Sequence, residues 1–249
     1  MPTLTDSLLD PLLGVDRMGP RITYYDDATG ERIELSTVTL ANWAAKTANL
    51  LREEFGMGRD SRVAVLLPAH WQTVAVLLGA WWIGAEVVLV SPPGRFAPAP
   101  DDEGPADCAL CTSDRLAEAD EAVAGGEVAV LSLDPFGKPV ADLPIGVTDY
   151  ATAVRVHGDQ VTPERFPGPA LANRTVEEVL AEAHRSAERQ GLTGEDRVMS
   201  DRTWASPTEL IENLLAALAA GASLVQQANP DPAAQDRRRV TEKVTRTLE

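Results

Sequence analysis

Residues 62–94, RVAVLLPAHWQTVAVLLGAWWIGAEVVLVSPPG, contain two short apolar runs separated by a longer one. The runs 63–67 and 86–90 are rich in Val and Leu, which predicts strands buried on both faces of a parallel sheet. The intervening stretch 70–83 is long enough for a helix that returns the chain to the second strand. Because glycines and Glu86 interrupt it, the apolar run 74–90 is too short for the ~18–20 residues of a membrane-spanning helix. The segment therefore predicts the opening strand–helix–strand unit of an α/β domain.

The same alternation continues through the rest of the chain. Because strands alternate with helices, the right-handed crossover rule predicts a three-layer αβα, doubly wound fold with a mostly parallel sheet. We expect one α/β domain over residues 1–249, made of a hairpin (22–35), a doubly wound core (36–230) and a terminal helix (231–249). The other expected core elements are helices at 38–54, 114–123, 175–190 and 208–220, and strands at 107–112, 127–133, 197–200 and 222–226, the last of the chain.

Three local patterns sharpen this outline. The sequences Thr175-Val-Glu-Glu178 and Ser206-Pro-Thr-Glu209 are typical of capping boxes that open helices. Prolines and acidic residues in the loop 92–106 favour a mobile segment. Along the terminal helix, a single apolar stripe of Val240, Val244 and Leu248 is expected to cover the surface of the sheet.

Composition excludes several classes of function. The chain has 38 acidic and 22 basic residues and a formal net charge of −16, whereas binding to nucleic acid requires a clustered basic surface. The first basic residue is Arg17, and the first 14 residues already contain Asp6 and Asp10, so the start does not resemble a secretion signal. These features predict a cytoplasmic protein that binds neither nucleic acid nor a membrane.

Common catalytic and phosphate-binding motifs are missing from the sequence. No G-x-S-x-G nucleophile elbow, G-x-G-x-x-G fingerprint or Walker loop is present. Cys108 and Cys111 have a C-x-x-C spacing, but a zinc site would need further ligands, and the pair falls inside an apolar strand. We therefore expect the two thiols to pack in the core, with a redox role as the less supported alternative.

Two histidines have positions of interest. His184 follows three glutamates on the expected helix 175–190, a pattern that favours a solvated acidic face over a metal site. His70 follows the strand 63–67, at the carboxyl edge where open α/β sheets bind their ligands. The alternative for His70 is a residue at a helix start that only contacts water.

Two stretches of the chain resemble the amino-terminal part of the adenylate-forming enzymes, the superfamily of AMP-dependent synthetases and ligases that includes acyl-CoA synthetases. The first stretch, 39–93, contains RDSRVAVLLP and WWIGAEVVLV, which are similar to the family's "G-D-R-V-A-l-l-l-P" and "k-a-G-A-v-v-p-l" strands. The second, 191–232, is similar to the region in which an aromatic residue after a strand borders the acyl pocket. The resemblance implies the fold of a truncated relative, close to short bacterial proteins related to these enzymes.

The chain departs from that family where a phosphate should bind. Family members carry a loop rich in Ser, Thr and Gly that ends in a Lys before the helix that here begins near Thr175. In its place stands 159–169, DQVTPERFPGP, with one Gly, three Pro and no Lys. Proline supplies no N–H and fixes its φ angle, so this segment would cradle a triphosphate poorly. The family's adenine-stacking motif, its ribose-binding acid and its small mobile domain with a catalytic Lys are not found either.

Two hypotheses about function follow. The first is a non-catalytic relative, without cofactor or metal, that acts as a module binding a small acyl or nucleotide-like molecule or a protein partner. Its ligand-binding residues would line a crevice, and they are His70, Ser91, Thr203, Trp204 and Ser206. Trp204 could equally be a core residue. The second hypothesis is an AMP-forming acid ligase that uses ATP and Mg²⁺ and is completed by a partner chain.

Overall fold

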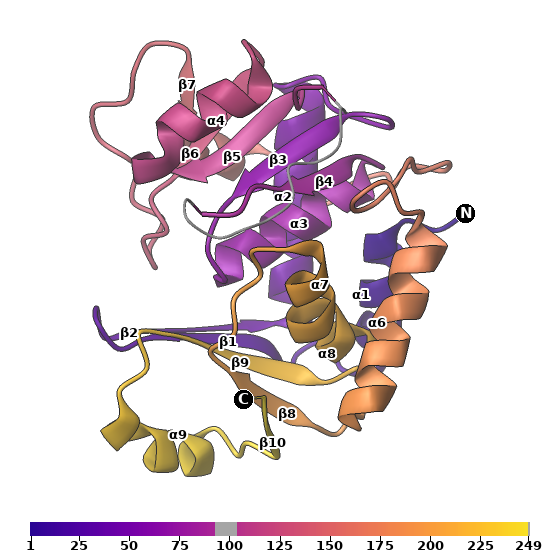
Figure 1. Ribbon diagram of the computed structural model, residues 1–249, viewed down its shortest axis with the longest axis vertical. Helices are drawn as coiled ribbons and strands as arrows, with labels where there is room; N and C mark the ends of the chain where they lie inside the picture. Colours follow the sequence, from indigo (N-terminus) through magenta and orange to yellow (C-terminus); the bar gives the residue numbers. More distant parts are fainter. Residues whose placement is uncertain (93–103, 249) are drawn as a thin grey trace.

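The computed structural model describes residues 1–92 and 104–248, and its strands divide between two sheets (Figure 1). The predicted mobility of the loop 92–106 concerns residues that lie mostly outside the described ranges. The first sheet, which we call the β3 sheet, has the strand order β4-β3-β5-β6-β7, and every neighbouring pair in it is parallel. Its strands are β3 (Arg62–Leu66), β4 (Glu86–Leu89), β5 (Cys108–Thr112), β6 (Glu127–Leu131) and β7 (Val147–Asp149).

The second sheet, the β1 sheet, has the order β10-β8-β9-β1-β2. Strands β1 and β2 form the predicted hairpin and are antiparallel, whereas all other neighbours in this sheet are parallel. The strands are β1 (Pro20–Asp26), β2 (Glu31–Ser36), β8 (Arg197–Ser200), β9 (Ser223–Ala228) and β10 (Arg246–Leu248). The predicted α/β class with mostly parallel pairing is confirmed, but the sequence pattern did not indicate that there are two sheets.

Helices α2 (Thr37–Glu53) and α3 (Trp71–Trp82) lie between the two sheets (Figure 1). Helix α2 contacts β1 and β2, while α3 contacts β4 as well as β1. The entire α3 helix is buried, in keeping with a sequence that is apolar except for Gln72 and Thr73 near its start. Helix α4 (Leu116–Val123) packs against strands β3, β5 and β6, and a short helix η1 (Ser113–Arg115) leads into it.

A second group of helices packs beside the β1 sheet. It contains α1 (Leu4–Val15), α6 (Val176–Gln190) and the continuous helix formed by α7 (Pro207–Leu210), η3 (Ile211–Leu215) and α8 (Ala216–Ala219). The middle section, η3, is a π-helix, a local widening often found near functional sites. The remaining short helices are α5 (Tyr150–Ala153), η2 (Val154–Val156), η4 (Pro232–Ala234) and α9 (Gln235–Thr241).

The two predicted capping boxes have different outcomes. Thr175 and Glu178 form the reciprocal pair of hydrogen bonds at the start of α6. Ser206 accepts a hydrogen bond from the Glu209 N–H at the start of α7, but the Glu209 carboxylate turns to the Thr203 hydroxyl and the Ala205 N–H. The prediction of a second capping box is therefore wrong, because the Glu209 carboxylate accepts hydrogen bonds from donors in the preceding loop and does not bond back to Ser206.

The predicted terminal helix begins where expected, since Asp231 caps the short helix η4 and α9 follows it, but its length and its apolar stripe are wrong. Helix α9 ends at Thr241, where Lys243 adopts a left-handed backbone with φ of +53°, and the chain then adds β10 to the β1 sheet. Strand β9 is consequently not the last strand. Val240 is 80% exposed, whereas Arg238 and Glu242 are the buried side chains of this segment. Polar contacts, rather than apolar ones, hold it to the sheet.

Candidate functional site

A small cavity lies between the two sheets at the carboxyl ends of β3 and β4, and we call it the inter-sheet crevice. It has a volume of about 330 Å³ and is lined by the ends of these strands, by the start of η1 and by the loop 203–205 that follows β8. Open α/β sheets bind ligands at this edge of their strands. The crevice thus lies where the sequence predicted a binding site.

Two of the five predicted site residues, Thr203 and Trp204, line this crevice, and Ser91 and Ser206 lie next to residues that do. Ser91 follows β4, and its hydroxyl donates to the Ala205 carbonyl at 2.7 Å, which links the two sheets. Thr203 and Trp204 line the cavity, and Ser206 caps the adjacent helix α7. They converge because the residues after β4 and those after β8 meet across the gap between the sheets.

Trp204 carries the polar group most relevant to a ligand. Its side chain is buried, with 3% of the residue exposed, and it lines the crevice. Within the described part of the chain, its indole Nε1–H has no hydrogen-bond acceptor. A buried donor left unpaired is unfavourable by about 1–3 kcal/mol.

Sequence reasoning missed Arg115, which forms another wall of the crevice. Its guanidinium donates to the carbonyls of Val90 and Ser91 at 3.0 Å each and pairs with Glu118 at 2.6 Å. Arg115 is buried and fixes the end of β4 against η1. Its position three residues before a glutamate on a short helix gives no sequence signal for this role.

His70, the fifth predicted residue, lies outside the inter-sheet crevice. It caps the start of α3, where its Nδ1 accepts a hydrogen bond from the Gln72 N–H at 3.2 Å. The ring packs edge-on against Tyr24, with 4.3 Å between centroids, and faces a different cavity. Burial lowers the pKa of His70, partly offset by Glu31. The alternative of a residue that only contacts water at a helix start also fails, because the side chain is 1% exposed.

In the proline-containing segment 159–174 before α6, several main-chain N–H groups donate hydrogen bonds to the rest of the protein. The Glu164 and Gly168 N–H groups donate to the carbonyls of Trp82 and Gly84, at 2.9 and 3.1 Å. The Asn173 N–H donates to the buried carboxylate of Glu86 at 2.6 Å. Further amides that donate within the protein are those of Phe166, Ala170 and Arg174. Main-chain groups that would cradle a phosphate are thus engaged in structural hydrogen bonds.

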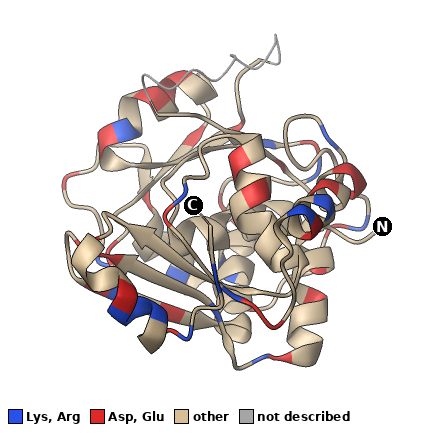
Figure 2. Ribbon diagram, turned by 60° about the horizontal axis from the view of Figure 1, so that its bottom comes forward, with Lys and Arg blue, Asp and Glu red and all other residues tan. Residues whose placement is uncertain are grey.

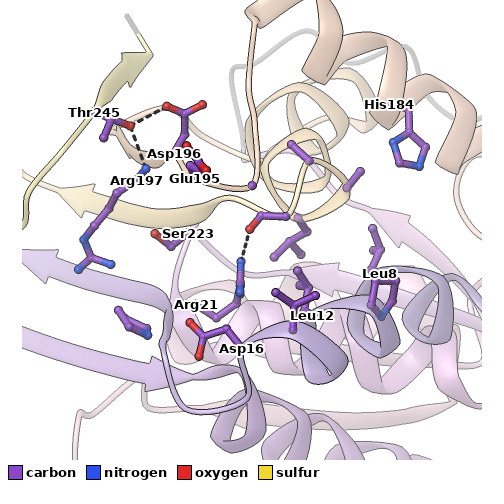
Figure 3. Close-up of a pocket in the computed structure, with 18 of the residues that line it drawn as sticks. Leu8, Leu12, Asp16, Arg21, His184, Glu195, Asp196, Arg197, Ser223 and Thr245 are labelled. Carbon is purple, nitrogen blue, oxygen red and sulfur yellow. Dashed lines mark hydrogen bonds between the residues drawn. The ribbon is translucent and has the colours of Figure 1, made fainter.

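A larger cavity of about 700 Å³ lies at the amino ends of β8 and β9, next to α1 (Figure 3). Its walls include Leu8 and Leu12 on one side and a set of paired charges on the other. Arg21 donates to the Gly221 and Ala222 carbonyls at 2.6 and 2.8 Å, and burial lowers its pKa. Asp196 accepts from the Thr245 hydroxyl at 2.7 Å. Since these groups are satisfied by the protein itself, we assign no ligand here.

Metal binding and redox chemistry receive no support from the described residues. They hold no group of three or more His, Cys, Asp or Glu side chains arranged for a metal ion. Cys108 and Cys111 are free thiols buried in separate parts of the core, and burial raises the pKa of each to about 12. His184, the weaker metal candidate, is an exposed residue of α6. The predicted packing role of the two cysteines is confirmed.

No family model matches the sequence. A curated protein of Mycobacterium tuberculosis (strain ATCC 25618 / H37Rv), described as a TIGR03089 family protein, is 64% identical over 250 residues. The alignment covers 99% of this chain and 98% of that relative. The chain belongs to the TIGR03089 family. Among the described residues of this family member, no helix has both the length and the apolar character to cross a bilayer.

Solved structures place the TIGR03089 chain among acyl-CoA synthetases by fold. The acyl-CoA synthetase of Brucella canis superposes with a TM-score of 0.79 at 20% identity, covering 98% of this chain and 46% of the synthetase. Acetoacetyl-CoA synthetase from Streptomyces lividans gives 0.76 at 17% identity, covering 98% and 42%. The anthranilate CoA ligase AuaEII, in complex with anthranoyl-AMP, gives 0.67 at 14% identity, covering 94% and 46%.

These comparisons confirm the predicted resemblance to adenylate-forming enzymes at the level of the fold. The TIGR03089 chain spans less than half the length of each of these synthetases. Over that length the two-sheet architecture is shared, so the carboxyl edges of β3, β4 and β8 occupy corresponding places in the fold.

Proposed function

We propose that this protein is a non-catalytic relative of the acyl-CoA synthetases that binds a small acyl compound in the inter-sheet crevice. The observation that carries the proposal is Trp204, a buried aromatic residue that lines a cavity of about 330 Å³ and whose Nε1–H has no acceptor among the described residues. A carboxylate or thioester oxygen would accept this hydrogen bond. The apolar residues at the ends of the two strands, such as Val65 and Leu89, would contact a short hydrocarbon chain.

The size of the crevice supports a small ligand. Ligand pockets commonly have volumes of ~300–1,000 Å³, and this cavity falls at the lower end of that range. A short carboxylic acid fits such a volume, whereas an acyl adenylate would need considerably more room. Arg115 in the wall is held in place by hydrogen bonds to the carbonyls of Val90 and Ser91, and the Ser91 hydroxyl donates to the Ala205 carbonyl beside it.

The hydrogen bonds of the segment 159–174 support our proposal that the protein does not form adenylates. Its amides donate to Trp82, Gly84 and Glu86, so gripping a phosphate would require these bonds to break. Each buried amide that lost its acceptor would raise the free energy by about 1–3 kcal/mol. An enzyme that binds the phosphates of ATP with main-chain amides binds them more tightly when those N–H groups have no other hydrogen-bond acceptor before ATP arrives.

A second candidate function is an AMP-forming acid ligase completed by a partner chain. The observation in its favour is the fold shared with the anthranilate CoA ligase AuaEII, which was solved with anthranoyl-AMP. In this case ATP, AMP and Mg²⁺ would be the cofactors. The sign of activity would be release of pyrophosphate from ATP with a carboxylic acid and the partner, and a blank result across a broad acid panel would count against it.

Isothermal titration calorimetry separates the two candidates. Acetate, butyrate, benzoate and their CoA thioesters are titrated into the protein, as are ATP and AMP with and without Mg²⁺. We expect binding of at least one acyl compound and none of the nucleotides. Micromolar, magnesium-dependent binding of ATP or AMP would overturn the non-catalytic assignment.

A matched pair of variants tests the role of the indole. Trp204→Phe removes the Nε1–H and keeps an aromatic ring, so the acyl compound should bind about tenfold more weakly. Trp71→Phe makes the same change at another buried indole whose Nε1–H is also unpaired among the described residues, but which does not line the crevice. Equal affinities of the two variants would exclude the proposed hydrogen bond.

A further inference from the structure

A separate cavity of about 880 Å³ lies between the β1–β2 hairpin, the start of α3 and the loop 132–136, and we call it the hairpin cavity. Pro68 contributes to this cavity and to the inter-sheet crevice, whereas Trp204 lines only the crevice. The volume is within the range of small-molecule sites. The charged residues in its wall are three acids and one base, namely Asp26, Glu31, Asp134 and Arg32.

Glu31 carries a mostly buried negative charge without a positive partner in this cavity. Its side chain is 8% exposed, and no described residue donates a hydrogen bond to its carboxylate. Nε2 of His70 lies 3.6 Å from Oε1, but burial lowers the pKa of His70 more than Glu31 raises it, so the ring is neutral at neutral pH. Oε1 is closed off from solvent, whereas Oε2 is open to the cavity. A buried carboxylate without a counter-charge is unfavourable, so a cation beside Oε2 would stabilise the protein.

Arg32, the next residue of β2, does not supply this counter-charge. Successive side chains of a strand point to opposite faces of the sheet. The Arg32 guanidinium lies 2.9 Å from a carboxylate oxygen of Glu34 and 2.9 Å from one of Glu242, and it donates to the Tyr25 hydroxyl. Its charge is thus neutralised by two carboxylates of its own. The potential inside the hairpin cavity is therefore set by the acidic residues.

Asp26 and Asp134 each bind the protein through one carboxylate oxygen and leave the other free. Oδ1 of Asp26 accepts from the Ala28 N–H and from the side chain of Asn229, at 2.9 Å each. Oδ1 of Asp134 accepts from two main-chain N–H groups of the turn that follows, at 2.9 and 3.3 Å. Within the described residues no group donates to Oδ2 of either residue, and neither atom is closed off from solvent. Both oxygens can therefore accept from a ligand.

The arrangement of these carboxylates favours an organic cation over a metal ion. The described residues hold no group of three such side chains arranged for one metal ion. Two positive charges separated by a hydrocarbon chain can instead reach different carboxylates. The ring of Phe136 is 80% exposed and lines the cavity, where it offers a surface for methylene groups or for an ammonium group. Further apolar residues in the wall are Ile33, Pro68, Leu133 and Pro135.

We propose that the hairpin cavity binds a short aliphatic diamine, with one ammonium group at Glu31, the other at Asp134 or Asp26, and the methylene chain against Phe136. Each ammonium group supplies three donors, which suits carboxylate oxygens that accept no bond from the protein. An anion would meet three carboxylates, and a neutral molecule would leave the charge of Glu31 uncompensated. This site is independent of the acyl ligand proposed for the inter-sheet crevice.

An NMR titration of the intact protein tests the class of ligand. The probes are putrescine as a diamine, butylamine with one ammonium group on the same chain, butanediol with none, and Mg²⁺. We expect putrescine to bind with a dissociation constant of about 0.1–1 mM and to shift the amide signals of 29–33 and 132–136. Butylamine should bind about tenfold more weakly, because it reaches one carboxylate only. Equal affinity for butylamine or butanediol, displacement of putrescine by equimolar Mg²⁺, or shifts confined to other regions would overturn the proposal.

Matched variants separate this site from general attraction to a protein with a net charge of −16. Glu31→Gln and Asp134→Asn should each weaken putrescine binding about tenfold. Asparagine keeps the Oδ1 acceptor of the turn, so only the free oxygen of Asp134 is lost. The control Glu188→Gln removes the same charge from an exposed position of α6 that does not line the cavity. Equal losses in all three variants would mean that the attraction is not specific to this site.

Thermal melting adds a readout that distinguishes binding from a structural role of Glu31. Because its charge has no counter-charge in the free protein, Glu31→Gln should raise the melting temperature without ligand while it weakens putrescine binding. Saturating putrescine should raise the melting temperature of the wild type more than that of the variant. A variant that melts at a lower temperature and binds putrescine as tightly as the wild type would contradict the proposal.

Discussion

The guanidinium of Arg238 stacks on the ring of Tyr25, with 4.0 Å between its central carbon and the ring centroid. The same guanidinium donates to both carboxylate oxygens of Asp27, at 2.5 and 3.1 Å, and to the Gln227 side chain. One turn later, Glu242 accepts hydrogen bonds from Tyr25 at 2.5 Å and from Arg197. These side chains dock the carboxy-terminal segment onto the outer face of the β1 sheet.

Arg238→Ala should therefore destabilise the protein substantially. The variant loses the cation–π contact and leaves Asp27, whose side chain is 17% exposed, without its counter-charge. Breaking a mostly buried ion pair in this way reduces the free energy of unfolding by about 3 kcal/mol. Urea denaturation followed by circular dichroism measures the change.

Arg237→Ala provides the control for this prediction. Arg237 precedes Arg238 on α9 but is exposed, so its removal should change the free energy of unfolding by less than ~0.5 kcal/mol. Equal losses in the two variants would show that the loss of a positive charge, rather than the docking contact, matters.

Acid should weaken the same docking surface. Hydrogen bonds from Arg238 hold the pKa of Asp27 below its ordinary value of 3.8. Burial would raise the pKa of Glu242, but hydrogen bonds from Tyr25, Arg197 and Arg32 outweigh it and hold the pKa below 4.5. Because both values are lower in the folded state, their stabilisation is complete above about pH 4.5 and is lost as the pH falls through the folded values.

This pH dependence can be measured by urea denaturation between neutral and acidic pH. The wild type should lose stability faster than Glu242→Gln as the pH falls below 4.5, because the variant no longer has this titrating carboxylate. Parallel stability curves for the two proteins would mean that Glu242 contributes nothing to acid sensitivity.

Deletion of residues 232–249 should cause dimerisation or precipitation. It removes β10, the neighbour of β8 at the edge of the β1 sheet, and uncovers the ring of Tyr25. An unpaired strand edge next to an exposed aromatic surface promotes association. Light scattering coupled to size-exclusion chromatography gives the oligomeric state, and a soluble, unchanged monomer would refute the expectation.

Basic and acidic residues occur on the same helices, although the formal net charge is −16. In Figure 2, blue basic positions are interspersed with red acidic ones along several helices, and α9 contributes basic residues beside acidic ones. Our prediction that nucleic acid is not a partner stays a prediction, and this view is in keeping with it.

The sequence predicted those parts of the fold that depend on local pattern. The buried strand β3 and the helix α3 follow directly from continuous apolar runs, and the hairpin follows from its turn residues. Strand partners, however, are set by contacts distant in the chain. The division into two sheets, with β10 beside β8, could therefore not be read from periodicity. Helix α1 was not predicted, since Pro11 and Gly14 interrupt its apolar pattern.

The candidate site was predictable to a similar extent. Ser91 and Trp204 follow parallel strands, and they lie near each other because the Ser91 hydroxyl donates to the carbonyl of Ala205, the residue after Trp204. His70 also follows a parallel strand in the sequence. However, its side chain caps helix α3, and its ring therefore packs against Tyr24 of the hairpin. Glu31, whose carboxylate lies 3.6 Å from Nε2 of His70, comes from β2 in the other sheet. Only the tertiary structure reveals that pair.

Both cysteines should resist modification in the native protein. Cys108 and Cys111 are buried, and burial raises each thiol pKa to about 12, so almost no thiolate forms at neutral pH. Iodoacetamide followed by mass spectrometry should therefore label neither residue until urea unfolds the chain. Rapid labelling of either thiol without denaturant would require an open or electropositive environment that the structure does not have.

The close approach of α2 and α3 depends on Gly79. A Cβ atom at this position would lie 2.8 Å from Cβ of Thr47 and 2.9 Å from the Ala44 carbonyl oxygen. Alanine is the better helix former by ~1 kcal/mol, but overpacking costs ~1–3 kcal/mol, and here it involves main-chain atoms that cannot rotate away. We therefore expect Gly79→Ala to reduce the free energy of unfolding by about 1–2 kcal/mol in urea denaturation.

Gly14→Ala is the control, because it makes the same substitution at a helix position where no neighbouring atoms would contact the added Cβ. Gly14 is a residue of α1, and no described atom comes within 4 Å of its built Cβ. Here only helix propensity acts, so the variant should gain up to about 0.5–1 kcal/mol in the same urea titration. Opposite signs for the two variants are the expected result, because steric overlap outweighs propensity only where the helices touch. A gain in stability for Gly79→Ala would show that α2 and α3 can separate freely, and the packing between the two sheets would then have to be looser than described.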